Sequence, residues 1–246
     1  SARFWTYWGT SLIYSMENVA ISEVNEEYQF QNSYAYYYYA EGKRRISAIA
    51  PTLYYSTVDS PIFPSSGTKV LAGYRYAGGF LGGDIYLHKL RLEMVHFQPL
   101  WKRHVLGMHL AFEGLQPFGG RGIPFYEKFF MGGERSIRGF DIYNLGPRDK
   151  NGNVLGGSKS LLVNLEYAIP LTQQFSFVFF YDIGNSYDVG VPIRLKDVYS
   201  STGLELKVFV PMLNVPFRLI FAYNPRLLEP GDPHFVFKFA VGPSFY

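Results

Sequence analysis

The sequence contains no cysteine, which excludes a disulfide framework and any metal site built on thiolates. No continuous apolar run reaches the length of about 18 residues that a membrane-spanning helix needs, so the sequence predicts no transmembrane helix. Helical periodicity is almost missing. The net charge of +3 is small and the basic residues are scattered, so composition gives no support to nucleic-acid binding.

Patterns that indicate catalysis are equally scarce. The histidines lack the spacing of metal ligands; they are His88, His96, His104, His109 and His234. Neither a nucleophile elbow nor a Ser-His-Asp order is present. The stretch 78–83 superficially resembles a phosphate-binding loop, but neither a Lys-Ser/Thr pair nor a helix follows it, so we interpret it as a hairpin loop. We therefore expect no enzyme activity, no metal and no cofactor.

Aromatic residues, in contrast, are abundant. The chain has 21 Tyr and 22 Phe, and its aromatic content of 19% exceeds its charged content of 17%. Such a composition fits a surface that touches lipid and the lipid–water interface. The chain opens into a strand-like pattern without a signal peptide, which an exported protein would have lost.

Apolar and polar residues alternate along most of the chain, as they do in β-strands that have one apolar face. In 160–169, for example, Leu161 and Val163 share one face while Asn164 and Glu166 share the other. The alternation recurs at 175–182, 204–210, 217–224 and 235–242, and less regularly at 3–18, 27–41, 44–58, 67–78, 88–94 and 108–113. The pattern predicts an all-β fold of about 11 strands.

The connections differ in length between the two ends of these strands. Short turns occur at 170–174 and 210–216, and longer polar loops occur near 184–196, 224–233 and 117–158. This difference is typical of a transmembrane antiparallel β-barrel, which has short periplasmic turns and long extracellular loops. A soluble β-sandwich or lipocalin-like barrel also alternates and stays an alternative. The many large side chains on the apolar faces and the aromatic chain end favour the membrane barrel.

The longest loop contains the most informative stretch, 131–140, which reads Met-Gly-Gly-Glu-Arg-Ser-Ile-Arg-Gly-Phe. Loops of this length are uncommon and usually functional. The segment 131–149 resembles the sixth extracellular loop of the BamA family of outer-membrane assembly proteins. Its superfamily also includes TamA, two-partner-secretion translocators and the chloroplast import channel. The Ile-Arg-Gly-Phe core is the most diagnostic motif.

Other motifs match the family in the same order along nearly the whole chain. They are Gly156-Gly157, Leu165-Glu166-Tyr167, Phe180-Tyr181-Asp182-Ile183-Gly184-Asn185, Gly203-Leu204-Glu205-Leu206 and Val210-Pro211-Met212-Leu213, with a turn at Thr57-Val58-Asp59-Ser60-Pro61, Pro64 and Gly67. The family barrel has sixteen strands and follows periplasmic POTRA domains. The resemblance therefore implies that residues 1–246 form one partial barrel domain without POTRA domains or first strands. A naturally short, 12-stranded relative is the alternative.

The resemblance also implies a site inside the barrel, formed by the loop motif Ile137, Arg138, Gly139 and Phe140. In the family the loop arginine enters the lumen and pairs with carboxylates that match Glu166 and Asp182. Alternation places both carboxylates on the polar faces of their strands, which is the lumen if the aromatic faces meet lipid. The alternatives are a solvated loop arginine and an acid/base carboxylate pair, although an arginine partner would hold both carboxylates ionised.

The sequence has two further features of interest, the glycines near Arg138 and the last strand. Gly132, Gly133 and Gly139 are expected to allow tight backbone conformations near Arg138, with ordinary loop flexibility as the alternative. The last strand resembles the family's lateral gate, a seam that opens toward the bilayer. Its residues are Phe239, Gly242, Pro243, Phe245 and Tyr246. Glycine and proline weaken strand pairing there, although they also fit a simple bend near the chain end.

The function implied is an insertase that folds and inserts β-barrel proteins into the bacterial outer membrane. The implied partners are unfolded outer-membrane β-barrel clients, assembly-machinery lipoproteins, the lipid bilayer and lipopolysaccharide, with no nucleic acid. The alternatives are a polypeptide translocator of the same superfamily (TamA-like or two-partner secretion) and a passive porin.

Overall fold

The computed structural model describes residues 2–3, 6–23 and 42–244, and it shows one antiparallel sheet in which the strands follow sequence order. The strands are β1 (Ala2–Arg3), β2 (Trp8–Ile21), β3 (Gly42–Ser56), β4 (Gly67–Ala77), β5 (Leu87–Pro99), β6 (Val105–Pro117), β7 (Lys159–Pro170), β8 (Phe175–Tyr187), β9 (Tyr199–Val210), β10 (Val215–Tyr223) and β11 (Phe235–Val241). Short 3-10 turns are η1 (Gly79–Leu81), η2 (Trp101–Arg103), η3 (Phe125–Glu127) and η4 (Leu195–Asp197). No helix of the described residues is long and apolar enough to cross a membrane.

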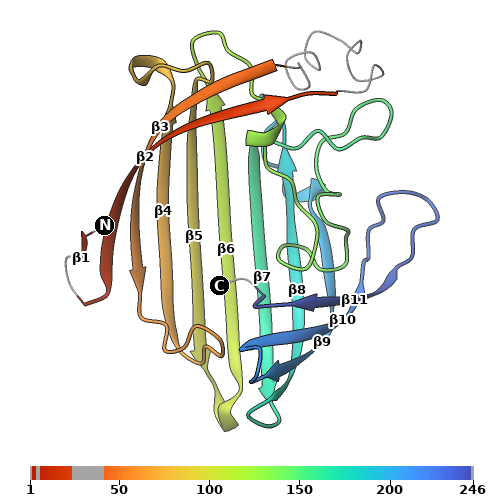
Figure 1. The fold of residues 1–246 in the computed structure, drawn as a ribbon. Coiled ribbons are helices and arrows are strands. Elements are labelled where there is room, and N and C mark those ends of the chain that lie inside the picture. The colour runs from red at the N-terminus through yellow and green to blue at the C-terminus, as the bar shows by residue number, and fades with distance from the viewer. Residues whose placement is uncertain (1, 4–5, 24–41, 245–246) are drawn as a thin grey trace.

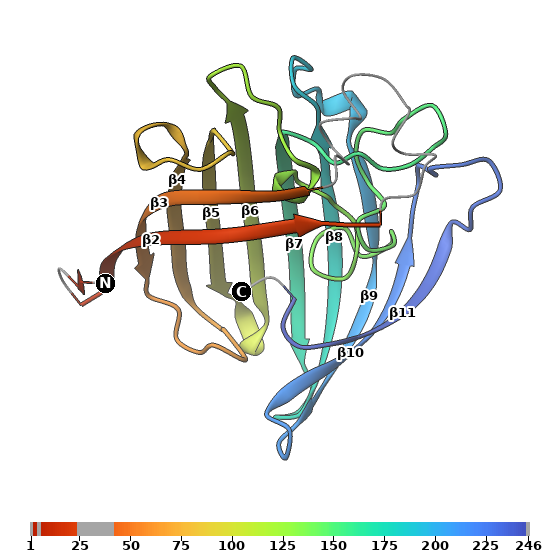
Figure 2. The ribbon, with the colours of Figure 1, turned by 45° about the horizontal axis from the view of Figure 1, so that its top comes forward.

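The sheet curves around the long loop between β6 and β7, so that the loop lies on its concave side (Figure 1, Figure 2). Strands β4 to β10 form the wall, while β2 and β3 sweep across one end of it. Strands β5, β6 and β8 have 13 residues each, enough to cross a bilayer at a tilt. In the described part of the chain no ladder joins β11 to β1 or β2, so the sheet has two edges.

The outer face of the wall is apolar and the inner face is polar, which confirms the predicted orientation. On β8, Phe175, Phe177 and Phe179 point outward and are 40–51% exposed. Residues of the other parity point inward, and among them Val178, Phe180 and the charged Asp182 are at most 2% exposed. Alternation with apolar side chains outward is the arrangement of a transmembrane barrel wall and not of a soluble sandwich, whose rings would be buried.

The N-terminal part differs from the predicted strand pattern. The prediction of one strand over 3–18 is wrong, because the chain reverses there and β1 pairs antiparallel with β2, Ala2 opposite Thr10. The predicted strand 27–41 lies outside the described residues, and β2 pairs directly with β3. Every other strand predicted from alternation is present.

The two ends of the wall carry different connections, as predicted. Residues 100–104, 171–174 and 211–214 link strands by short turns at the lower end in Figure 1, and 57–66 closes the same end. Residues 118–158, 188–198 and 224–234 form the longer loops at the other end. By the general pattern of outer-membrane barrels, the short turns face the periplasm and the long loops face outside.

Candidate functional site

The loop 118–158 brings Arg138 into the lumen, where its side chain is 2% exposed. Asp182 on β8 holds the guanidinium by two hydrogen bonds, from Nε at 2.8 Å and from Nη2 at 2.6 Å, and also accepts the backbone N–H of Arg138 at 3.0 Å. Glu166 on β7 accepts from Nη1 at 2.7 Å. The two predicted carboxylates thus both contact the loop arginine, in a fork geometry that favours charge-assisted bonds.

A third carboxylate, Glu205 on β9, extends this cluster. Its Oε2 atom lies 3.1 Å from Nη1 of Arg138 and 2.8 Å from Nη2 of Arg218. Lys207 bridges Glu166 at 2.9 Å and Glu205 at 3.7 Å. The cluster therefore holds three acids and three bases, all nearly buried, so that its formal charge sums to zero. The face of the guanidinium of Arg138 also stacks on Phe180, with the central carbon 3.9 Å from the ring centroid.

The register of the sheet explains why these side chains meet. Glu166 pairs with Phe180, and Phe180 pairs with Gly203, so the three lie on one rung across β7, β8 and β9. Asp182 and Glu205 lie on neighbouring inward positions of their strands. A Cβ at Gly203 would lie 1.9 Å from Phe221 O, so this glycine lets the backbones of β9 and β10 approach closely at the rung.

The rest of the motif packs against the wall and fixes the loop. Ile137 and Phe140 are 0% and 5% exposed and pack in a cluster with Leu162 of β7. The φ angle of Gly139 does not lie in the left-handed region, so the expectation of a tight backbone conformation there is wrong. A Cβ at Gly139 would instead collide with Asn224 and Ser201, so the glycine permits close packing. The left-handed conformation occurs at Gly132 and Gly133, where φ is +100° and +99°.

Glu127 on η3 is a second buried loop anchor of opposite charge. Its carboxylate accepts from Arg75 of β4 at 2.7 Å and from Lys89 of β5 at 3.3 Å, and it is 6% exposed. The loop thus places one cation, Arg138, against acids on β7–β9 and one anion, Glu127, against bases on β4 and β5. Sequence reasoning missed Glu127, because its partners Arg75 and Lys89 are distant in sequence and no motif marks it.

The end of β11 touches the same cluster. Gly242 has φ +102°, and its N–H donates to Pro216 O at 2.8 Å as the chain turns inward. Arg218 donates to Pro243 O at 3.4 Å and to Glu134 O of the loop at 3.2 Å. Lys238 of β11 donates to Asp141 of the loop at 2.9 Å and also to Phe140 O. Two cations, Arg218 and Lys238, therefore connect the loop, the wall and the terminal strand.

The remaining residues predicted at the gate lie elsewhere. Phe239 is on the outer face, 55% exposed, with its ring 5.6 Å from that of Phe217. Phe245 and Tyr246 lie outside the described residues. Within the described residues no group of three or more His, Asp or Glu side chains could hold a metal.

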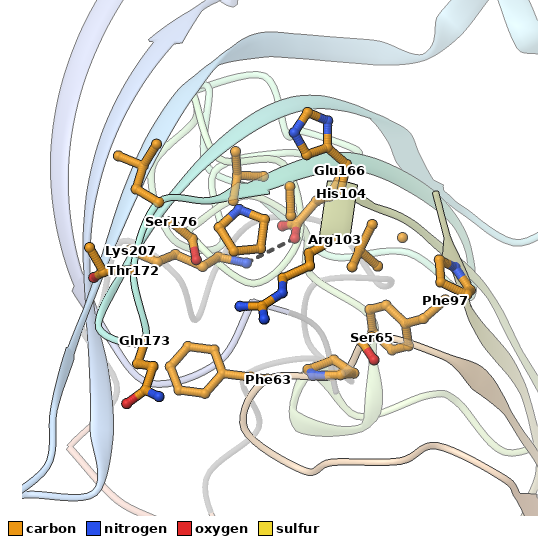
Figure 3. Close-up of a pocket in the computed structure, with 18 residues that line it drawn as sticks. Phe63, Ser65, Phe97, Arg103, His104, Glu166, Thr172, Gln173, Ser176 and Lys207 are labelled. Carbon is orange, nitrogen blue, oxygen red and sulfur yellow. Dashed lines mark hydrogen bonds and ion pairs between the residues drawn. The ribbon is translucent and has the colours of Figure 1, made fainter. Parts of the chain in front are cut away.

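A cavity of about 850 Å³ lies on the short-turn side of the charged cluster (Figure 3). The Glu166–Lys207 ion pair borders it on one side and Phe63 on the other. Phe63 belongs to the 57–66 turn, and its ring lies 5.0 Å from that of Phe209 on β9. The turn therefore reaches across the mouth of the lumen.

A curved antiparallel wall with an apolar outer face, a charged inner face and a long loop tied inside defines a transmembrane β-barrel with an occupied lumen. Its place is the outer membrane. The chain belongs to the Omp85 superfamily, because the family model described as the Omp85 superfamily domain matches residues 1–245.

Relatives with known names agree with this assignment. The chain is 32% identical over 196 residues to the outer membrane protein assembly factor BamA of Nitratidesulfovibrio vulgaris, covering 77% of this chain and 24% of that protein. It is 26% identical over 198 residues to the sorting and assembly machinery component 50 homolog A of Xenopus laevis, covering 68% and 41%. The chain thus spans about a quarter of the bacterial relative.

The fold also matches a solved structure. The crystal structure of BamA from Haemophilus ducreyi lacking POTRA domains 1–3 aligns with a TM-score of 0.73, covering 96% of this chain and 51% of that one. At 19% sequence identity this likeness shows the shared fold alone.

Proposed function

We propose that the protein containing this chain folds and inserts β-barrel proteins into the outer membrane, without covalent chemistry. The observation that carries the proposal is the loop of an Omp85 barrel held in the lumen by Arg138, together with relatives that are named assembly factors. Its clients are unfolded outer-membrane proteins, and its partners are the other components of an assembly machinery.

The buried loop supports an assembly role over that of a passive porin. A porin needs a continuous water-filled channel. Here Arg138 and Ile137 are 1% and 0% exposed. Apolar contacts and ion pairs together hold the loop against the wall. Such a plugged lumen favours client passage at an edge of the sheet over flow through its centre.

The terminal strand supplies that edge in our proposal. β11 has seven residues, pairs with β10 on one side, and within the described residues has no strand on the other. An unpaired edge offers main-chain donors and acceptors to a client strand, which is the basis of β-augmentation. Because the chain turns inward at Gly242, β11 offers only seven residues for pairing with a client strand. A seam at this edge is therefore weaker than the ladders of the wall, which have 9 to 13 residue pairs.

Lys238 and Arg218 link the edge to the loop. Because both cations bond loop carbonyls and one also bonds Pro243 O, loop docking and the position of β11 are coupled. We propose that the docked loop holds the edge ready for a client strand.

Arg138→Ala in the full-length protein, reconstituted in vesicles, tests this function. The substitution leaves three acids with two bases, and breaking a buried pair costs about 3–5 kcal/mol, so we expect an undocked loop and slow folding of an added client porin. Arg121→Ala is the matched control, because Arg121 lies in the same loop, is exposed, and its guanidinium stacks on Tyr86. Wild-type client folding by the Arg138 variant would refute the proposal.

A further inference from the structure

The outer face of the wall carries one exceptional residue. In the described strands β4 to β11, twelve of the thirteen Asp, Glu, Lys and Arg side chains occupy inward positions, and Lys159 alone is on the lipid-facing parity. It precedes Leu161, Val163 and Leu165 on the same face of β7. A cation on the lipid face is costly near the bilayer centre and tolerated near the interface. Lys159 begins its strand at the extracellular end, which places it at the interface.

Lys159 borders a pocket of about 460 Å³ on this outer face. The pocket is made by a glycine: one rung of the sheet runs Tyr74, Leu90, Gly114 and Lys159 across β4 to β7. Because Gly114 has no side chain, a hollow separates Leu90 from Lys159. Phe112 forms its floor, and Val189 and Gly190 of the 188–198 loop lie over it.

The ammonium of Lys159 is held over this hollow and has free donors. Nζ donates to Val191 O at 2.8 Å, and an ammonium has three N–H groups. Within the described part of the chain no carboxylate forms an ion pair with Lys159. The charge is thus fixed in place and uncompensated, at a position next to the membrane.

An aromatic cluster marks the depth of the pocket. His88 lines the pocket and packs against Phe118, with ring centroids 4.7 Å apart, and Phe118 packs against Tyr76 at 5.4 Å. Aromatic girdles lie at the level of lipid headgroups. Toward the bilayer centre, the next rung presents Leu92, Phe112 and Leu161.

We propose that this pocket binds a lipid of the outer leaflet that carries an anionic phosphate headgroup. The phosphate accepts from Lys159, and an acyl chain lies in the hollow at Gly114 and continues over Phe112 and Leu161. The charge of Lys159 selects an anion, and the apolar floor and the membrane-facing opening select a lipid over a soluble phosphate. This site is independent of the assembly function proposed above, because neither the loop motif nor β11 contributes to it.

The test counts lipids bound to the full-length protein by native mass spectrometry, with phosphatidylglycerol and phosphatidylcholine of identical acyl chains as probes. We expect wild type to prefer phosphatidylglycerol. Lys159→Gln should weaken phosphatidylglycerol binding about fivefold, the factor for one lysine near an anionic surface, and leave phosphatidylcholine unchanged. Lys159→Arg should retain the preference. Lys150→Gln, an exposed lysine of the long loop, is the control.

A second variant tests the hollow without touching the charge. Gly114→Leu fills it, and the backbone tolerates a side chain there because a Cβ would lie 3.6 Å from Phe112 in ordinary contact. It should weaken binding of both lipids, and heat-modifiable mobility on gels verifies that each variant is folded. Equal binding of the two lipids to wild type, or unchanged binding in the folded Lys159→Gln and Gly114→Leu variants, overturns the proposal.

Discussion

Removing Arg138 and Asp182 separately and together gives a quantitative test of the charged cluster. Either single change to alanine leaves a buried charge without its partner, which costs about 3–5 kcal/mol of unfolding free energy. In the Arg138→Ala variant the uncompensated group is Asp182, which keeps a bond from Asn164 at 2.8 Å. In the Asp182→Ala variant the excess charge is positive.

The double variant behaves differently, because every remaining charge still has a partner. Glu166 keeps Lys207 at 2.9 Å, and Glu205 keeps Arg218 at 2.8 Å. The double variant should therefore lose about as much unfolding free energy as one single variant, and much less than the sum of the two single losses. The cycle should give a coupling of about 3 kcal/mol, the upper end for residues in contact.

The assay is urea unfolding of the full-length protein in lipid vesicles, followed by tryptophan fluorescence and by heat-modifiable mobility on gels. Arg91→Ala is the control, since Arg91 pairs with Glu93 but its side chain is 57% exposed, and such pairs contribute about 0–1 kcal/mol. Additive losses in the Arg138/Asp182 cycle would refute the reasoning, because they would mean that the two groups do not share one interaction.

Three further outcomes follow from contacts described above. Lys238→Ala removes both bonds from β11 to the loop, so amide exchange in β11 should accelerate while exchange in β8 stays unchanged; equal protection of β11 would contradict the coupling. Gly139→Ala forces a Cβ into Asn224 and should lower the urea midpoint by the equivalent of about 1–3 kcal/mol, whereas Gly114→Ala should not change it. Burial raises the pKa of the Asp59 carboxyl, but hydrogen bonds from Ser65 and Ser66 outweigh it and leave this pKa below its usual value. Because the folded pKa is lowered, the contribution of Asp59 is complete above the ordinary carboxyl pKa and disappears as pH falls through the lowered one; amide exchange in the 57–66 turn should rise over that interval, and an Asp59→Asn variant should show no such step.

Alternation predicted the faces of the wall because a strand directs successive side chains to opposite sides whatever its neighbours do. Alternation could not predict which inward side chains of neighbouring strands lie at the same level of the lumen. Glu205 and Lys207 share the inward parity with Glu166, yet only the pairing of Val178 with Glu205 and of Arg218 with Lys207 places them at the height of the cluster, where Glu205 contacts Arg138 and Lys207 contacts Glu166. Register depends on turn geometry and on every rung of the ladder, so parity in one strand does not determine it.

The loop was the least predictable region. Its motif indicated Arg138, but Glu127 and Lys238 contact partners 38 to 98 residues away in sequence. At Gly139 the sequence predicted backbone freedom, and the structure shows a steric requirement set by Asn224, a residue 85 positions further on. Such requirements arise from tertiary contact, and local sequence holds no record of them. The reversal before β2 was missed for a similar reason, since two paired residues leave almost no alternation to detect.

Within the described residues, one side of β11 pairs with no strand, and this edge has a consequence for energetics. Lipid hydrocarbon cannot form hydrogen bonds with peptide groups. An edge strand that faces it therefore needs another segment as its hydrogen-bonding partner at all times. Replacing one matching segment by another conserves the number of main-chain bonds. The balance of such an exchange then depends on strand length and on side chains at the junction, and the seven residues of β11 keep the number of bonds involved small. In the function we propose, exchange of one strand for another at this edge therefore costs no main-chain hydrogen bonds.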